Sequence, residues 1–345
     1  MSGKTLICRL DNMGDVLLTG PAVRAVAAKT GPVTFLAGPQ GAGAARLLPG
    51  VDQVLTWDAP WVGFHPPPVA ASDITAIVGE LAAGAFSRAL IFTSFHQSSL
   101  PLALLLRMAA VPWIGAHSDD YPGSLLDLRH HSPPAIPEVQ RALSLAAAAG
   151  FTLPSSDAGE LRITRPASQQ AFTESGDYLV VHPGASVSAR RPSAQWYRTV
   201  LAALRESGYS VVVTGGPGEA EFAADAIGST LGVRNLAGKT SLESLAAVLS
   251  RAAAVIVPNT GPAHLAAAVG APVISLFAPV VPASQWAPPA HKLVILGDQS
   301  APCRNSRARV CPIPGHPCLD SIPPEDVLSA VARLYRTTQI GELVP

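Results

Sequence analysis

Charged residues are scarce in this sequence. Lys and Arg together number 24, as do Asp and Glu, so charged side chains form 14% of the 345 residues and the formal net charge is zero. This balance argues against a general electrostatic attraction to nucleic acid. Hydrophobic residues form 48% of the chain, which argues against a disordered protein and predicts large buried cores. The length predicts about two domains.

Long apolar runs are also missing. No stretch of about 18 apolar residues is free of Pro, Gly and charge, so no transmembrane helix is expected. The first residues, Met1-Ser-Gly-Lys-Thr-Leu-Ile-Cys8, lack the apolar segment of a signal peptide. We therefore expect a cytoplasmic protein. Peripheral contact with the inner face of the membrane stays open, because no clear basic amphipathic helix decides it.

Cysteine is the third scarcity. The chain has 4 Cys, and three of them, Cys303, Cys311 and Cys318, lie close in sequence to His316. Three Cys and one His could hold Zn²⁺ in a tetrahedral site. However, the cysteines are farther apart than the usual spacing, and no Cys-x-x-Cys occurs. We expect free thiols, with a metal site or a disulfide as the alternatives.

What the sequence does contain is a repeated strand–helix pattern. Apolar runs of strand length, such as Thr5–Leu10, Val111–Ile114 and Tyr178–His182, alternate with segments of helical periodicity. Because these runs do not alternate with polar residues, both faces of each strand are expected to be buried. The pattern predicts doubly wound α/β architecture, with parallel sheets covered by helices.

The composition also predicts the domain plan. We place an N-terminal domain at residues 1–155, a linker region rich in Ser, Thr, Asp and Pro at 156–176, and a second domain at 177–322. A C-terminal helix within 323–345 could pack back on the N-terminal domain. The segment 59–72, which is rich in Pro and carries aromatics, is expected to be a connector, with a substrate lid as the alternative.

One polar elbow interrupts an apolar part of the C-terminal half. It reads Asn259-Thr-Gly-Pro-Ala-His264. Asn259 or Thr260 can cap the helix that follows, and Pro262 suits its first turn. The free backbone N–H groups of such a helix start, with Thr260, Gly261 and His264, predict an anion pocket. The alternative is a capped helix on which His264 merely packs.

A second elbow precedes it in the same half. The segment His182-Pro-Gly-Ala-Ser-Val-Ser-Ala-Arg-Arg-Pro192 also follows a strand and precedes a helix. Arg190 and Arg191 offer guanidinium groups suited to phosphate oxygens, and Ser186 offers a hydroxyl. A solvated basic loop is the alternative. Two anion elbows in one domain favour phosphate binding.

A third turn lies between these two elbows. Thr214-Gly-Gly-Pro-Gly-Glu-Ala-Glu221 is neither the G-x-G-x-x-G fingerprint nor a P-loop. Gly215 and Gly216 suit a tight strand-to-helix turn. Glu219 or Glu221 could accept hydrogen bonds from ribose hydroxyls. Either carboxylate could instead only complement the helix dipole.

Two acids lie in the turn after the first apolar run. Asp11 and Asp15 flank Asn12 and Gly14. Asp15 is a candidate general base for an attacking hydroxyl. The other three residues are candidates for lining the cleft that we expect between the two domains. The alternative for Asp15 is a structural helix cap.

Taken in their order along the chain, the motifs resemble those of glycosyltransferase family 9, the heptosyltransferase family of lipopolysaccharide assembly. The similar segments are Arg9-Leu-Asp-Asn-Met-Gly-Asp15, His182-Pro-Gly-Ala-Ser186 with Arg190 and Arg191, Leu236-Ala-Gly-Lys-Thr-Ser-Leu242 and Asn259-Thr-Gly-Pro-Ala-His264. The resemblance implies a GT-B fold, in which two Rossmann-like doubly wound domains face each other across a cleft. The acceptor would bind to the first domain and a nucleotide-sugar donor to the second.

The resemblance also implies a reaction. It is the inverting, metal-independent transfer of a sugar, typically a heptose from ADP-heptose, to a hydroxyl of a glycan, a lipid-linked or a small-molecule acceptor. Asp15 occupies the position of the family's base, and Arg190 that of a Lys that neutralises the pyrophosphate. Thr260, Gly261 and His264 fall on its phosphate-binding elbow. No cofactor is expected, and no Asp-x-Asp metal motif occurs.

Two positions depart from the family pattern. Asn259, which we assign to the nucleoside site, replaces an Asp, and Pro192 replaces a Trp. The competing functions are a nucleotide-sugar epimerase or hydrolase of GT-B fold, and a nucleotide-sugar-binding protein without turnover.

Overall fold

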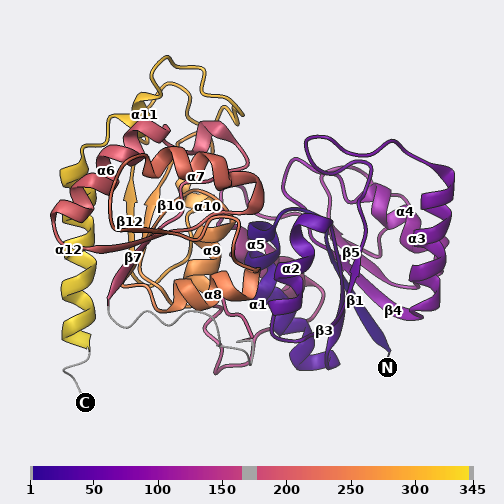
Figure 1. Cartoon of the computed structure of the whole chain (residues 1–345). Coiled ribbons are helices and arrows are strands. Elements are labelled where there is room, and N and C mark those ends of the chain that lie inside the picture. The colour runs from indigo at the N-terminus through magenta and orange to yellow at the C-terminus, as the bar shows by residue number, and fades with distance from the viewer. Residues whose placement is uncertain (1–2, 165–176, 342–345) are drawn as a thin grey trace. The chain divides into compact units, whose positions relative to one another are not determined.

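The chain folds as two compact units, Met1–Thr164 and Arg165–Pro345. The computed structural model describes residues 3–164 and 177–341. Each unit contains one six-stranded sheet (Figure 1). Of the predicted linker, residues 156–164 are irregular and belong to the first unit, and residues 165–176 lie outside the described part of the chain.

The first unit alternates strands and helices. Its elements are β1 (Lys4–Arg9), α1 (Met13–Thr30), β2 (Val33–Ala37), α2 (Pro39–Leu47), β3 (Val51–Thr56), α3 (Ala71–Ala83), β4 (Phe86–Ile91), α4 (Leu100–Met108), β5 (Ile114–His117), β6 (Leu128–His130) and α5 (Glu138–Ala148). The strands pair in parallel in the order β3-β2-β1-β4-β5-β6. Helices α1, α2 and α5 cover one face of the sheet, and α3 and α4 cover the other (Figure 1).

The second unit repeats this plan. Its elements are β7 (Tyr178–Val181), the 3₁₀ turn η1 (Ser188–Arg190), α6 (Ala194–Glu206), β8 (Ser210–Val213), the 3₁₀ turn η2 (Pro217–Glu219), α7 (Ala220–Ile227), β9 (Val233–Asn235), α8 (Leu242–Ser250), β10 (Ala254–Pro258), α9 (Gly261–Ala268), β11 (Val273–Leu276), α10 (Ala283–Trp286), β12 (Leu293–Leu296), α11 (Pro317–Asp320) and α12 (Pro324–Gly341). The parallel order is β12-β11-β10-β7-β8-β9.

Both sheets have the same topology. In each, the chain starts at a central strand, adds two strands on one side, and then crosses to build the other side. The direction of winding therefore reverses between β1 and β4 in the first unit, and between β7 and β10 in the second. In open α/β sheets, ligands bind outside the carboxyl ends of the strands at this switch point.

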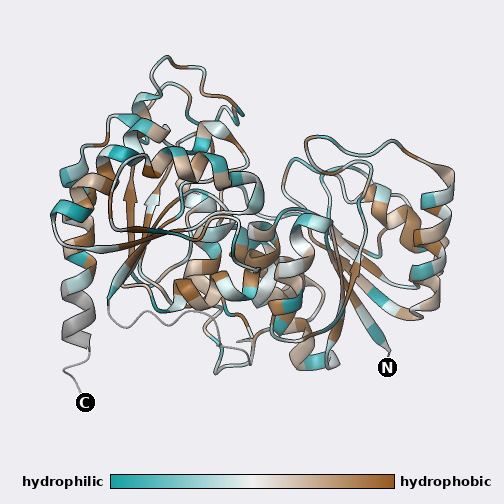
Figure 2. Ribbon diagram, in the orientation of Figure 1, coloured by the Kyte–Doolittle hydropathy of each residue, from teal (hydrophilic) through white to brown (hydrophobic). Residues whose placement is uncertain are grey.

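The central strands are apolar because helices bury both of their faces. Every residue of β2 and β10 is buried, and Figure 2 shows the central strands of both sheets largely in brown, the hydrophobic end of the scale. Each helix adds one apolar stripe. In α6 the stripe includes Trp196, Val200 and Leu204, and the helix begins where the Ser193 hydroxyl accepts the Trp196 N–H.

The C-terminal helix belongs to the second unit. Val327, Val331 and Leu334 of α12 are buried in the same core as α6 and the second sheet. Their spacing puts them on one helical stripe. The possibility that this helix packs back on the N-terminal domain stays a prediction.

Candidate functional site

The switch point of the first unit contains a buried ion cluster. Arg9, the last residue of β1, is only 3% exposed, and its Nε lies 2.7 Å from the Asp11 carboxylate. Its terminal nitrogen Nη2 donates to Asp15 at 3.0 Å and also lies 3.8 Å from the Glu138 carboxylate. We call these four residues the Arg9 cluster. Ser94, which follows β4, accepts a further hydrogen bond from Arg9 at 3.0 Å.

Asp15 is the one carboxylate of this cluster that solvent reaches appreciably. It lies in the first turn of α1 with its side chain 16% exposed, whereas those of Asp11 and Glu138 are 6% and 5% exposed. Burial raises the pKa of the Asp15 carboxyl to about 6, and Asp11 and Glu138 add to the increase while Arg9 opposes it. Asn12 holds the cap position of α1, so Asp15 is not the helix cap that the sequence allowed.

A second polar group continues along the carboxyl ends of β5 and β6. His117 is buried, and burial, reinforced by the charge of Arg141, lowers its pKa to about 2. Its ring therefore stays neutral, with Nδ1 3.1 Å from the Ser132 hydroxyl. Arg141 of α5 donates to the Thr93 carbonyl and lies 3.9 Å from Glu138, which joins this group to the Arg9 cluster.

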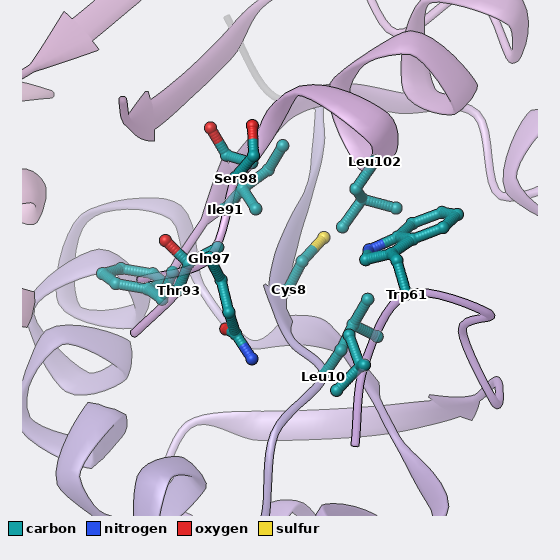
Figure 3. A pocket seen from close by; sticks show the side chains of 11 residues that line it. Cys8, Leu10, Trp61, Ile91, Thr93, Gln97, Ser98 and Leu102 are labelled. Carbon is teal, nitrogen blue, oxygen red and sulfur yellow. The ribbon is translucent and has the colours of Figure 1, made fainter. Parts of the chain in front are cut away.

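A small pocket opens beside the Arg9 cluster, with an empty volume of about 310 Å³ that includes space open to solvent. Figure 3 shows the indole of Trp61 and the side chain of Leu102 across from Gln97. Gln97 also donates to Asp11 at 2.5 Å, so one wall of the pocket touches the cluster. Trp61 lies in the predicted 59–72 loop, which therefore contributes to a pocket; α3 begins at Ala71, inside the predicted loop.

The switch point of the second unit is organised differently. After β10, Asn259 is buried and Thr260 caps α9 by position, without a side-chain cap hydrogen bond. Among the described residues, Asn259 Nδ2, Thr260 Oγ1 and His264 Nδ1 are buried without a hydrogen-bond partner. Buried polar atoms in native proteins nearly always have partners. In this elbow, defined by residues 259–264, three side chains therefore keep hydrogen-bonding capacity that the described protein groups do not use.

Arg190 lies close enough to His264 for its charge to act on the imidazole. Burial lowers the pKa of His264 to about 4, and the positive charge of Arg190 adds to the decrease. The imidazole is therefore neutral near pH 7. Since β7 and β10 are neighbours in the sheet, the loop after β7 brings Arg190 to the start of α9. The elbow thus combines a helix N-terminus, a hydroxyl, a neutral imidazole and a guanidinium, a set of groups suited to a phosphate.

The two arginines that the sequence paired point to different partners. The Arg191 guanidinium lies 3.4 Å from the centre of the Phe222 ring, a cation–π contact, and burial lowers its pKa. Its electrostatic neighbours are Tyr197 and Glu219. Arg190 lies at the anion elbow, whereas Arg191 lies beside α7.

The third turn is held by its own carboxylate. Glu219 accepts the Gly216 N–H at 2.8 Å and lies 3.3 Å from His182 Nε2. The hydrogen bond from His182 lowers the pKa of Glu219 although burial opposes the change. A Cβ at Gly184 would overlap this carboxylate, so a larger residue there would displace the Glu219 side chain. Glu219 therefore organises the turns after β7 and β8.

The remaining predicted site residues are placed less distinctively. Gly215 is buried in the turn after β8, and Gly14 is buried in α1. Gly261 and Pro262 form the first turn of α9. Asn12, Ser186 and Glu221 are exposed, so they can contact a ligand but no described contact directs them toward one.

The three late cysteines gather in the second unit. Cys303 and Cys318 are buried in its core, and Cys311 packs against it. All three are free thiols. Burial, with the neighbouring Cys303 and Cys311, raises the pKa of Cys318 to about 12, which makes it a poor nucleophile. Within the described residues, no group of three or more His, Cys, Asp or Glu is arranged for a metal ion.

Sequence reasoning missed several residues of these sites. Glu138, Arg141 and Gln97 carry no motif, and their roles come from the strand order that brings α5 and the loop after β4 to β1. Trp61 is predicted only as part of a loop.

Among the residues that the structure describes, no helix is both long and apolar enough to span a membrane.

Comparison with known proteins identifies relatives. Residues 75–316 match the model of glycosyltransferase family 9 (heptosyltransferase). Lipopolysaccharide heptosyltransferase 3 of Escherichia coli is 32% identical over 176 residues, which are 48% of this chain and 49% of that protein. Lipooligosaccharide heptosyltransferase 2 of Campylobacter jejuni is 26% identical over 169 residues, 47% of this chain and 52% of that protein. The chain thus spans about half the length of these curated relatives.

Solved structures match nearly the whole chain. The E. coli ADP-heptose lps heptosyltransferase II aligns with a TM-score of 0.78 at 19% identity, over 97% of this chain and 99% of that chain. The E. coli heptosyltransferase WaaC with ADP-2-deoxy-2-fluoro heptose gives a TM-score of 0.70 at 21% identity, over 96% and 99%. These likenesses confirm the predicted GT-B fold.

Proposed function

The chain belongs to glycosyltransferase family 9, and we propose that it transfers a sugar from a nucleotide-sugar donor to an acceptor hydroxyl. We assign the donor to the second unit and propose ADP-heptose. Two kinds of relative support this choice. The curated relatives are named as heptosyltransferases, and the structural relative WaaC is described with ADP and with a fluorinated ADP-heptose.

The observation that carries the proposal is the elbow at residues 259–264. Its buried atoms Thr260 Oγ1 and His264 Nδ1 have no partner among the described residues, and Arg190 contributes a positive charge beside them. A diphosphate supplies the acceptor oxygens that these groups lack. As the sugar leaves, negative charge grows on the diphosphate, and fixed donors stabilise that charge without reorganising.

The first unit would supply the base. Asp15 would take the proton of the acceptor hydroxyl while its oxygen attacks the anomeric carbon of the donor. The bond from that carbon to the diphosphate breaks on the opposite face, so one displacement inverts the configuration. A carboxyl whose pKa is about 6 is ionised at pH 7 yet basic enough to accept a proton. We propose that no metal is needed, because Arg190 and the α9 N-terminus do the same electrostatic work.

The acceptor site is proposed to adjoin Asp15. The pocket between Trp61 and Gln97 offers an apolar wall and a polar wall, which suits part of a hydroxylated acceptor such as a glycan. We propose that the enzyme acts in the cytoplasm, where nucleotide sugars are available.

Calorimetric titration tests the donor proposal. ADP, UDP and GDP are titrated separately into the full-length protein, in one series with EDTA and in a second series with Mg²⁺. We expect ADP to bind most tightly and Arg190→Ala to weaken ADP binding about 10- to 100-fold, since it removes a charged hydrogen-bond donor. Arg198→Ala, which removes a partly buried arginine of α6 that donates to Gln195 and to the Asp225 carbonyl, is the matched control and should leave the affinity unchanged.

The outcomes are distinct. Failure of all three nucleotides to bind would overturn the donor site. Nucleotide binding that disappears in EDTA would overturn the metal-free proposal. Binding without transfer from ADP-heptose to any lipopolysaccharide-core acceptor would favour a nucleotide-sugar-binding protein without turnover.

A further inference from the structure

Glu138 is a buried carboxylate that no sequence motif marks. It begins helix α5, far along the chain from the N-terminal turn, and its side chain is only 5% exposed. A charged group this deeply buried is costly unless opposite charges compensate it. Two arginines do so: Arg9 Nη2 lies 3.8 Å and Arg141 Nη1 lies 3.9 Å from Glu138 Oε2.

The Arg9 cluster contains more negative than positive charge. Arg9 faces three carboxylates, those of Asp11, Asp15 and Glu138. Asp11 occupies its Nε, whereas Asp15 and Glu138 both approach Nη2. Asp15 therefore shares one nitrogen of Arg9 with Glu138 and does not have the full benefit of the positive charge.

The charged groups that face Asp15 come from two elements besides its own helix. Arg9 and Asp11 lie at the end of β1, and Glu138 comes from α5. Arg141, one turn along α5, contacts Glu138. Asp11 and Glu138 both act on Asp15 as like charges, which favour the protonated carboxyl, and Arg9 acts against them.

We propose that Glu138 is a positioning residue that acts on Asp15 through Arg9: it draws part of the Arg9 positive charge away from Asp15 and so keeps Asp15 a strong enough base to take the acceptor proton. This inference rests on the proposed function in so far as Asp15 is the base. Glu138 need not touch either substrate.

Replacing Glu138 by Gln should make Asp15 a weaker base. Without the Glu138 charge, both Arg9 and Arg141 become less compensated, and both changes favour ionised Asp15. The pKa of Asp15 should therefore fall below its present value of about 6. In the transferase, the acidic limb of the rate profile should move to lower pH, while the rate on the plateau above pH 7 should fall by up to about threefold because a weaker base assists less.

The test that needs no turnover is carboxyl NMR of the full-length protein with ¹³C-labelled aspartate. The Asp15 resonance is assigned by its loss in Asp15→Asn. In Glu138→Gln, we expect the midpoint of Asp15 titration to move to lower pH by about half a pH unit or more. Glu138→Asp keeps the charge and should leave the midpoint closer to that of the wild type. Glu80→Gln, the same change at an exposed site on α3, should leave it unchanged.

An Asp15 midpoint that stays in place or rises in folded Glu138→Gln would overturn the inference, as would a rate that falls equally at every pH. If Glu138→Gln does not fold, Glu138→Asp carries the test: its shorter side chain holds the carboxylate farther from Arg9, so the Asp15 midpoint should move to lower pH by a smaller amount, and an unchanged or higher midpoint would overturn the inference. A shift of the Asp15 midpoint in a protein that transfers no sugar would support the coupling and overturn only the proposed function.

Discussion

The two units place their candidate site residues at the same topological position but surround them in opposite ways. In the first unit, the Arg9 guanidinium is hydrogen-bonded or ion-paired to Asp11, Asp15 and Ser94 within the protein. In the second, Thr260 Oγ1 and His264 Nδ1 are buried without a partner among the described residues. A group that must exchange a proton needs a fixed field around it before substrate arrives. A group that must hold an anion keeps its donors for that anion.

Replacing Asp15, the proposed base in the first unit, should change the rate of sugar transfer more than any other substitution considered. Asp15→Asn keeps the shape of the side chain and removes its basicity. We expect the rate of sugar transfer to fall about 10²- to 10⁴-fold, the range for losing a general base. The affinity for ADP should change less than about twofold, because the donor groups lie in the second unit. Steady-state rates and calorimetry on the same preparation measure both, and an unchanged rate would refute the role of Asp15.

The next effect concerns stability. Arg9→Met removes the one cation that faces three buried carboxylates, and we expect it to lower the free energy of unfolding of the first unit by about 3–5 kcal/mol. Urea denaturation followed by circular dichroism measures the change. Arg46→Met, at an exposed position of α2, is the control and should have little effect. If Arg9→Met lowers the free energy of unfolding no more than the control does, Arg9 does not stabilise the carboxylates of the cluster.

Replacing Thr260, in the second unit, should have a smaller effect and tests whether its hydroxyl serves a ligand. Thr260→Val removes a hydroxyl that has no partner among the described residues, so we expect the free energy of unfolding to change by less than about 0.5 kcal/mol, while affinity for ADP falls about fivefold. Thr199→Val, on the exposed side of α6, controls for the change of shape. Strong destabilisation by Thr260→Val without loss of affinity would mean that the hydroxyl supports the fold and not the ligand.

The sequence predicts the architecture well where strands are buried on both faces. Runs such as Thr5–Leu10 correspond to central strands, because burial on both faces demands continuous apolar residues. The run Val111–Ile114 predicted a strand, but β5 begins only at Ile114, since Pro112 cannot donate to a sheet ladder. The edge strand β3 was not predicted, because its residues are only partly buried and give a weak apolar signal.

The site was predictable to the extent that local chemistry defines it. The elbow at residues 259–264 combines a helix start with polar side chains, and the sequence alone indicates an anion there. Partners that the fold brings from a distance could not be predicted. Arg190 and Arg191 are adjacent in sequence, yet Arg191 stacks on Phe222. The Glu219 carboxylate contacts Gly216 and His182 within the protein.

The Arg9 cluster also limits what can be transplanted. Its members come from a strand end, the turn that follows, the first turn of α1 and the first turn of α5, and Ser94 in the loop after β4 adds a hydrogen bond. Copying the Arg9-to-Asp15 segment onto another scaffold would bring two of the carboxylates without Glu138 or Ser94. Transferring the proposed base to another scaffold would require the whole first sheet with its helices. A substitution at Glu138 in α5 would act on Asp15, more than a hundred positions earlier in the chain.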